Sequence, residues 1–427
     1  MTNRSGSDGS EPKRDQRIWQ AGFLIGSAIG AAATVLGRRA ERSARRGLVD
    51  WPAAESIAVG RLRRASGALS PSALAATEPA YEAAMARIVP RLSQFLGADL
   101  PGVVERAGVV DRAGWVHANV STFAQLVSRL EADLMDQIVP QGGGLGKATV
   151  ALANRFVTSH QLGYMLAFMG QRVLGQYDIA LLSAEAPPGR LLFVEENIRQ
   201  TAGSLDIPLD PFRTWIALHE TTHAFEFEAH PWLRPYLAER LERQLAAFSR
   251  DASTLGREGL RRLGRALRGE AGGSHWMERL MSDEQRRLFR ETQSVMSLLE
   301  GFSDYVMDEV GRDVVPGVAK ISARFHERRE RRTTMERAIL RLTGMDLKME
   351  QYQRGERFVS GIAARGGPEA LRRLWDGPET LPLDAELDAP ERWIARVLGP
   401  ERTAGSSEPP ADSRHPAPHL PPRSAPQ

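Results

Sequence analysis

The sequence predicts a mainly helical α+β protein with a small β-sheet or hairpin. Apolar residues recur at the spacing of an α-helix in residues 123–139 and 336–345. A third helix is predicted over residues 215–227, which contain no Gly or Pro and include the sequence HETTH. Strand patterns are few, and the best are residues 177–183 and 190–195, joined by a turn rich in Pro and Gly. These two strands are predicted to pair as a hairpin.

Composition divides the 427 residues into four segments. Residues 1–16 are polar and charged, which predicts a disordered tail. Residues 17–37 contain an apolar stretch that is uncharged from position 18 onward. Residues 48–399 have the composition of a globular domain, and residues 400–427 are a Pro-rich segment that we also expect to be disordered.

The apolar segment 17–37 is long enough to span a bilayer as one helix. Gly22, Gly26 and Gly30 recur at every fourth position, a spacing that lets membrane helices approach closely. A membrane anchor is the first interpretation, and an apolar helix packed on protein or a cleaved signal peptide are the alternatives. Slightly more basic residues follow the segment than precede it, which predicts a cytoplasmic-facing domain. A soluble cytoplasmic protein is the alternative.

The chain has no cysteine and a net charge of +3. Disulfides, thiolate metal sites and cysteine nucleophiles are therefore excluded, and any metal must be held by histidines and carboxylates. Arginine-rich runs alternate with Glu or Leu at helical spacing, as on solvated helix faces. No aromatic pattern typical of a nucleic-acid-binding module accompanies them, so we expect no nucleic-acid partner.

The sequence HETTH fits the pattern H-E-x-x-H of zinc hydrolases. On a helix, His219 and His223 lie one above the other, so both imidazoles can reach one Zn²⁺. Glu220 projects beside them, where it can polarise a water molecule at the metal. The alternative is a buried helix with two hydrogen-bonded histidines and no metal.

A third protein ligand is needed, and His230 does not satisfy the known short-range pattern. The pattern H-E-x-x-H-x-x-G-x-x-H would place Gly at position 226 and His at position 229, where this chain has Glu226 and Ala229. His230 also precedes Pro231, which marks a helix end, so we interpret His230 as a surface or capping residue. Glu226 could be a ligand, although it lies so close to His223 that the site would be strained.

A distant pair of carboxylates is the better candidate. Glu300 and Asp304 share a helix face inside the apolar stretch MSLLEGFSDYVM. Glu300 is the predicted third ligand, and Asp304 is predicted to accept the N–H of a ligating histidine. Gly301 would let this helix approach the HETTH helix closely. The alternative is an ordinary polar helix face.

Several segments together resemble one family, the zincin-like metallopeptidases of type two, often labelled as associated with deazaflavin-coenzyme biosynthesis. The resemblance covers roughly residues 48–399. It is carried by LVDWPAA, VLGQYDIALL, LLFVEENI, FRTWIALHETTHAFEFEAHPWLRPYL, MSLLEGFSDYVMD, LKMEQYQRGERFV and LWDGPETLPLDAELDAPERWIARV.

The resemblance implies a zincin-like metalloprotease fold, mostly helical, with a small sheet near an H-E-x-x-H helix. It implies that His219 and His223 bind zinc and that Glu220 is the catalytic acid and base. Glu300 as third ligand combines the L-L-E-G segment with the gluzincin pattern of zinc ligands. The family often has histidine after that glycine, where this chain has Phe302.

The predicted function is therefore zinc-dependent hydrolysis of a peptide or protein substrate, with Glu220 assisting the attack of water. The first interpretation of Tyr352 is a packed, hydrogen-bonded tyrosine; as an oxyanion donor, Tyr352 is the candidate and Arg354 its alternative. Strand 190–195 could pair with an extended peptide by edge addition. The alternatives are a non-catalytic zinc-binding scaffold on the same fold and a metal-free, membrane-tethered interaction protein. No oligomeric state is predicted.

Overall fold

The computed structural model describes residues 47, 49–138, 145–178, 189–254, 281–330 and 347–399. The predicted polar tails, the apolar segment 17–37 and the predicted helix 336–345 lie outside these residues. Among the helices described, none combines the length and the apolarity needed to cross a membrane.

The chain forms two compact units. The first consists of Met1–Thr292 and Val306–Leu347, and the second of Gln293–Tyr305 and Lys348–Gln427. One continuous helix, α12 (Asp283–Glu309), contributes residues to both units.

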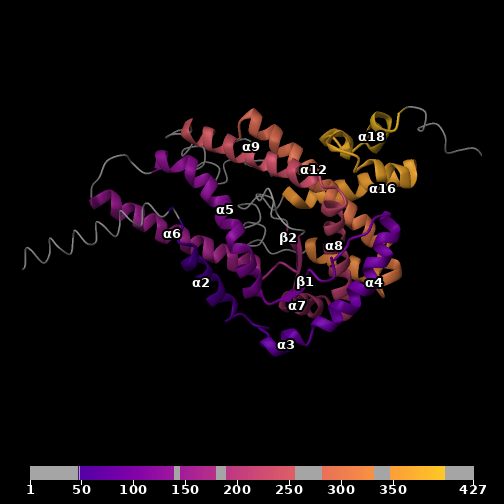
Figure 1. Cartoon of the computed structure of the whole chain (residues 1–427), viewed down its shortest axis with the longest axis horizontal. Helices are drawn as coiled ribbons and strands as arrows, with labels where there is room; N and C mark the ends of the chain where they lie inside the picture. The colour runs from indigo at the N-terminus through magenta and orange to yellow at the C-terminus, as the bar shows by residue number, and fades with distance from the viewer. Residues whose placement is uncertain are drawn as a thin grey trace, which may run out of the picture. The chain divides into compact units, whose positions relative to one another are not determined.

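Helices dominate the described part of the first unit, which confirms the predicted mainly helical α+β class (Figure 1). The predicted helix over 123–139 is the C-terminal half of α5. Besides α12, the helices are α2 (Trp51–Leu62), α3 (Pro71–Ala75), α4 (Glu78–Leu96), α5 (Arg112–Ile138), α6 (Leu145–Gly170), α7 (Glu195–Leu205), α8 (Leu209–Glu228), α9 (Leu233–Thr254), α13 (Gly311–Val314) and α14 (Val318–Glu330).

The sheet of the first unit has three strands, β1 (Ala107–Val110), β2 (Gly175–Asp178) and β3 (Arg190–Val194), in the order β1-β3-β2. The predicted hairpin partners do pair, since β2 runs antiparallel to β3 with Tyr177 opposite Leu191. β1, which was not predicted, runs parallel to β3 on its other side. The prediction that strand 190–195 offers a free edge is therefore wrong, because both sides of β3 are already paired.

Small residues set the closest helix packing in the first unit. The indigo helix α2 lies beside α6 (Figure 1), and a Cβ atom on Gly163 of α6 would lie 2.8 Å from the backbone oxygen of Ala54. The absent side chain thus permits backbone contact between the two helices. The adjoining core contains Ala58, Leu62, Trp115, Val116, Leu166, Ala167 and Val194.

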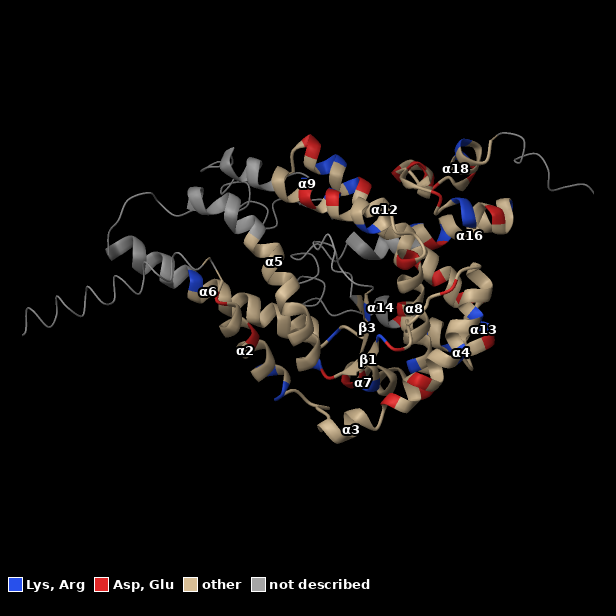
Figure 2. Ribbon diagram, in the orientation of Figure 1, with Lys and Arg blue, Asp and Glu red and all other residues tan. Residues whose placement is uncertain are grey.

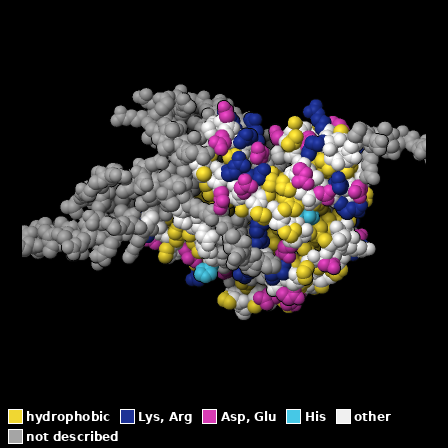
Figure 3. Space-filling model, turned by 45° about the horizontal axis from the view of Figure 1, so that its top comes forward, with side chains coloured by type: hydrophobic (Ala, Val, Ile, Leu, Met, Phe, Trp, Pro, Cys, Tyr) yellow, Lys and Arg dark blue, Asp and Glu magenta, His cyan; other side chains and the backbone are white. Residues whose placement is uncertain are grey.

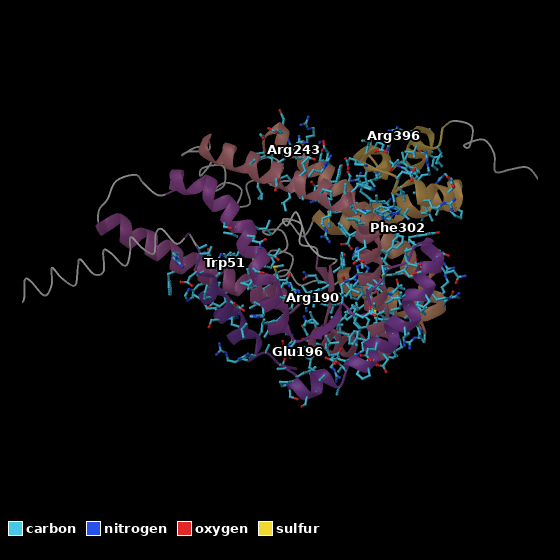
Figure 4. The ribbon with its side chains drawn as sticks, viewed as in Figure 1. Trp51, Arg190, Glu196, Arg243, Phe302 and Arg396 are labelled. Carbon is cyan, nitrogen blue, oxygen red and sulfur yellow. The ribbon has the colours of Figure 1, made fainter. Side chains whose placement is uncertain are left out.

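The second unit is built from a segment of α12 together with α16 (Leu347–Arg373), η1 (Pro378–Thr380), α17 (Asp384–Leu387) and α18 (Pro390–Val397). Edge-to-face aromatic pairs form its core: Phe302 with Trp375 at 5.0 Å between ring centroids, and Phe358 with Trp393 at 6.0 Å. Figure 4 labels Phe302, together with Arg396 of α18. Phe302, at the position where the family often has histidine, is therefore a core residue here.

Two glycines allow the backbones of α12 and α16 to come into contact where the two helices cross. A Cβ atom on Gly301 would lie 2.1 Å from the carbonyl carbon of Gly355, and one on Gly355 would lie 1.8 Å from the backbone oxygen of Ser297. These distances leave no room for any side chain at either position. Gly301 thus allows a close helix approach, as predicted, but the helix it meets is α16 and not the HETTH helix.

Candidate metal centre

The HETTH sequence lies in α8, which is almost entirely enclosed. Of its 20 residues, 14 are buried. It packs against α4, α7 and β2, and a helix surrounded on all sides is expected to be apolar over most of its surface. α8 ends at Glu228, three residues before Pro231, in agreement with the predicted helix end. The polar residues inside it therefore need partners within the fold.

The two histidines of HETTH point at one another through corresponding atoms. Nε2 of His219 and Nε2 of His223 lie 3.2 Å apart, and both side chains are half-buried. One carboxylate oxygen of Glu300 joins them, so that one ligand atom from each of the three residues lies within 4.8 Å of the others. The structure therefore brings together the three residues that the sequence singled out as metal ligands.

The spacing of the two imidazole nitrogens fits zinc. Two nitrogens bound to a tetrahedral Zn²⁺ at about 2.0–2.1 Å are separated by about 3.3 Å, close to the observed distance between the two Nε2 atoms. Two imidazoles and a carboxylate, with no thiolate, are also a donor set that zinc hydrolases use. His219, His223 and Glu300 are thus the residues that could hold a metal ion here.

Glu226, which the sequence offers only as a possible ligand, contacts a histidine of the candidate site instead. Its Oε2 atom lies 2.8 Å from Nδ1 of His223, and its side chain has no exposed surface. A carboxylate accepts the proton of Nδ1, which leaves the lone pair of Nε2 free for a metal. The i, i+3 spacing from His223 was the available signal, because that spacing places two side chains on one helix face.

Met307 of α12 faces the other histidine. Its sulfur lies 3.1 Å from Nδ1 of His219, and the residue is buried. Met307 follows Glu300 by two helical turns, so both lie on the same stripe of α12. Asp304, predicted to accept a proton from a ligating histidine, lies between them on this helix, and that role stays a prediction.

Glu220 faces the edge strand of the sheet. Its Oε2 atom accepts the backbone N–H of Tyr177 at 3.0 Å. Gly175 lies beside the same carboxylate, because a Cβ atom built there would be 2.6 Å from Cγ of Glu220 and 2.8 Å from Oε1. Glu220 is 8% exposed, so the buried carboxylate of HETTH is held against β2.

A second hydrogen-bonded group connects the sheet to the C-terminal end of α8. The hydroxyl of Tyr177 donates to Oε1 of Glu228 at 3.0 Å and accepts the backbone N–H of Gly189, while Arg106 contacts both Glu228 oxygens at 2.7 Å. Burial, followed by the nearby charge of Glu228, raises the pKa of Tyr177 to about 12. Tyr177 is therefore a neutral hydrogen-bonding residue at neutral pH.

The candidate oxyanion donors lie on α16. Tyr352 is in the first turns of that helix, and its side chain lies outside the described part of the chain. Arg354 directs its guanidinium to Asp388 at 2.7 Å and to Asp384 at 3.1 Å. These ion pairs within the second unit give Arg354 a structural role.

His230 lies at the end of α8. Its Nδ1 atom donates to the backbone oxygen of Glu226 at 2.9 Å, and the ring is half-buried. Burial lowers the pKa of His230 below its ordinary value. This arrangement agrees with the capping interpretation made from the sequence.

A buried helix with two histidines and a glutamate, and a further glutamate brought in from a distant part of the sequence, is the residue set of metallohydrolases of the H-E-x-x-H class. The chain belongs to the zincin-like metallopeptidase family, whose model matches residues 49–394. A search of curated proteins gave no match.

One solved structure is similar to this protein over most of the length of both chains. It is a crystal structure from Chloroflexus aurantiacus, described as that of a proposed hydrolase with a novel fold. The two chains share 34% sequence identity, covering 82% of this chain and 99% of the other, with a TM-score of 0.61. The family and this relative both point to a hydrolase.

Proposed function

We propose that the protein is a zinc-dependent peptidase in which His219, His223 and Glu300 hold the metal and Glu220 moves the proton. The observation that carries this proposal is the convergence of three ligand atoms within 4.8 Å, with two imidazole nitrogens 3.2 Å apart. The family membership and the hydrolase relative support the same reading.

Glu220 and Glu226 have separate roles in the proposed reaction. When bound, zinc supplies a Lewis acid for a carbonyl oxygen and lowers the pKa of water. Glu220 takes a proton from the attacking water and returns it to the departing amine. Glu226 holds the proton on Nδ1 of His223, which keeps that imidazole in the tautomer able to bind a metal.

Metal content of the full chain, measured by mass spectrometry, tests the ligand set. We expect about one zinc per chain in the wild type, as for a three-ligand site. His219→Ala and Glu300→Ala should each lose the metal, whereas Glu309→Ala is a matched control. Glu309 lies on the same helix and pairs with Arg312 at 2.9 Å, so this variant should keep the zinc.

Glu220→Gln tests the chemistry separately from the ligands. The variant should keep its zinc and lose hydrolysis of a mixed peptide library, because an amide cannot take up the proton. Peptidase activity retained by Glu220→Gln would overturn the catalytic assignment. Zinc binding without any activity in the wild type would instead favour the non-catalytic scaffold.

No partner other than this substrate class is proposed. Acidic and basic residues alternate along the ribbon of α9 in Figure 2, and side chains of both signs are interspersed on the face shown in Figure 3. In α9, Glu239 pairs with Arg243 at 3.8 Å. This pattern is that of a solvated helix face.

A further inference from the structure

The edge strand β2 lies against the carboxylate of Glu220, the residue to which we assign the proton transfer. A Cβ atom on Gly175 would come within 2.6 Å of Cγ, 2.8 Å of Oε1 and 2.9 Å of Cδ of Glu220. Real Cβ atoms do not approach other atoms so closely, so any side chain at position 175 would displace Glu220 or the strand. The missing side chain of Gly175 makes the space that Glu220 occupies.

The hydrogen bonding of β2 explains why the carboxylate lies there. β2 runs antiparallel to β3, and Val194 N donates to the backbone oxygen of Leu174 at 2.8 Å. Because the N–H groups of an antiparallel strand point alternately toward and away from its partner, that of Tyr177 points away from β3. Glu220 accepts this outward N–H at 3.0 Å.

We propose that Gly175 and the backbone N–H of Tyr177 together position the Glu220 carboxylate, with Gly175 as a positioning residue of the site. This inference rests on the proposed peptidase function for its catalytic consequence. The packing relationship does not, because it can be measured without activity.

A double-mutant cycle on thermal unfolding of the full, metal-free chain tests the packing. Gly175→Ala should lower Tm by about 2–5 °C, as overpacking of a buried site does in a chain of this size. Glu220→Ala removes the side-chain atoms that obstruct position 175. In that background, Gly175→Ala should lower Tm little or not at all. An equal decrease in Tm in both backgrounds, or no decrease in either, would overturn the proposal.

Gly108→Ala provides the matched control. Gly108 lies in β1, the opposite edge strand of the same sheet, and a Cβ atom there would meet nothing within 4 Å. Alanine at this position should leave Tm unchanged or raise it slightly, because it restricts the unfolded chain.

Kinetics of the zinc-loaded chain test the consequence for catalysis. Gly175→Ala should keep one zinc per chain and a similar KM but lose about ten- to a hundredfold in kcat, since a displacement of about 1 Å can cost that much. Thermal coupling together with an unchanged kcat would reject the positioning role.

The two proposals fail in different ways. If Glu220→Gln keeps full activity, the proposed function is wrong, whatever Gly175→Ala does to Tm. If Glu220→Gln is inactive but Gly175→Ala shows no thermal coupling with Glu220→Ala, only the positioning of Glu220 by Gly175 is wrong.

Discussion

Nδ1 of His223 and Oε2 of Glu226 lie 2.8 Å apart on one turn of α8. Glu226 is fully buried, so its charge is not screened by water and its hydrogen bond to the ring persists. The same helix thus supplies both a candidate ligand, His223, and the carboxylate that orients its imidazole ring.

Glu226→Gln should weaken zinc binding by about tenfold or more, because partners of ligating histidines typically contribute 10–100-fold to metal affinity. Competition titration with a zinc chelator measures this change. Glu228→Gln is the control, since Glu228 lies two residues further on and contacts Arg106 and Tyr177. Equal zinc affinities in the two variants would contradict the role given to Glu226.

Alanine should have opposite effects at two helical glycines. Gly355→Ala places a Cβ atom within 1.8 Å of the Ser297 backbone oxygen, so we expect the second unit to lose stability or to fail to form. Gly203 of α7 has open space, and Gly203→Ala should stabilise by about 0.5–1 kcal/mol through helix propensity. Urea denaturation of both variants measures the contrast. A stabilised Gly355→Ala would be incompatible with the α12–α16 crossing.

Glu195→Gln should destabilise the first unit by about 3–5 kcal/mol, because it leaves the buried guanidinium of Arg213 with the exposed Asp210, at 2.7 Å, in place of a buried counter-charge. Glu195 accepts hydrogen bonds from Tyr81 at 2.7 Å, from Arg199 at 2.6 Å and from Arg213. Burial lowers the pKa of Arg213, but hydrogen bonding by Glu195 more than offsets this.

The exposed pair of Glu309 and Arg312 supplies the comparison for Glu195. Arg312→Ala should change the free energy of unfolding by less than about 1 kcal/mol, because exposed ion pairs are screened. Chemical denaturation followed by circular dichroism measures both variants. Similar small losses in the two would mean that the buried carboxylate of Glu195 is dispensable.

The burial of the His230 imidazole predicts that the protein loses stability in acid. Its pKa is lowered from 6.5 by burial, so the unfolded chain takes up a proton before the folded one. The stability contributed by neutral His230 is complete above pH 6.5 and is lost as the pH falls from there toward the folded-state pKa.

The variant His230→Gln isolates this effect in metal-free protein, in which no zinc is released as the pH falls. The difference in unfolding free energy between wild type and variant should shrink as the pH is lowered below 6.5. A difference that stays constant between about pH 5 and 8 would show that His230 has the same pKa folded and unfolded.

The helix that carries HETTH could be predicted because its signals are local. The apolar spacing, the absence of Gly or Pro and the histidine pair all lie within 215–227. Glu300 could be proposed as a partner because a charged residue inside an apolar helix needs a reason to be there. The structure places the three candidate ligands, His219, His223 and Glu300, together.

Other features depend on contacts that spacing does not reveal. β1 is a half-buried strand of 4 residues, and its parallel pairing with β3 joins segments far apart in the sequence. This pairing places β3 at the centre of the sheet and made the edge prediction wrong. Gly175 is part of a segment that resembles the family, yet its closeness to Glu220 follows only from the packing of α8 on β2.

The glycine crossing also has a consequence for how this sequence can change. Gly301 follows Glu300 directly, and its contact with Gly355 leaves no freedom to rotate α12 at that point. Each residue inserted into an α-helix turns everything beyond it by about 100°. An insertion between Gly301 and Met307 would put Glu300 and Met307 out of phase, and one before Ser297 would turn Leu288 and Thr292 away from Gln244 of α9, which donates hydrogen bonds to both. The number of residues in α12 is therefore fixed on both sides of the crossing, so related sequences should differ there by substitution and not by insertion or deletion.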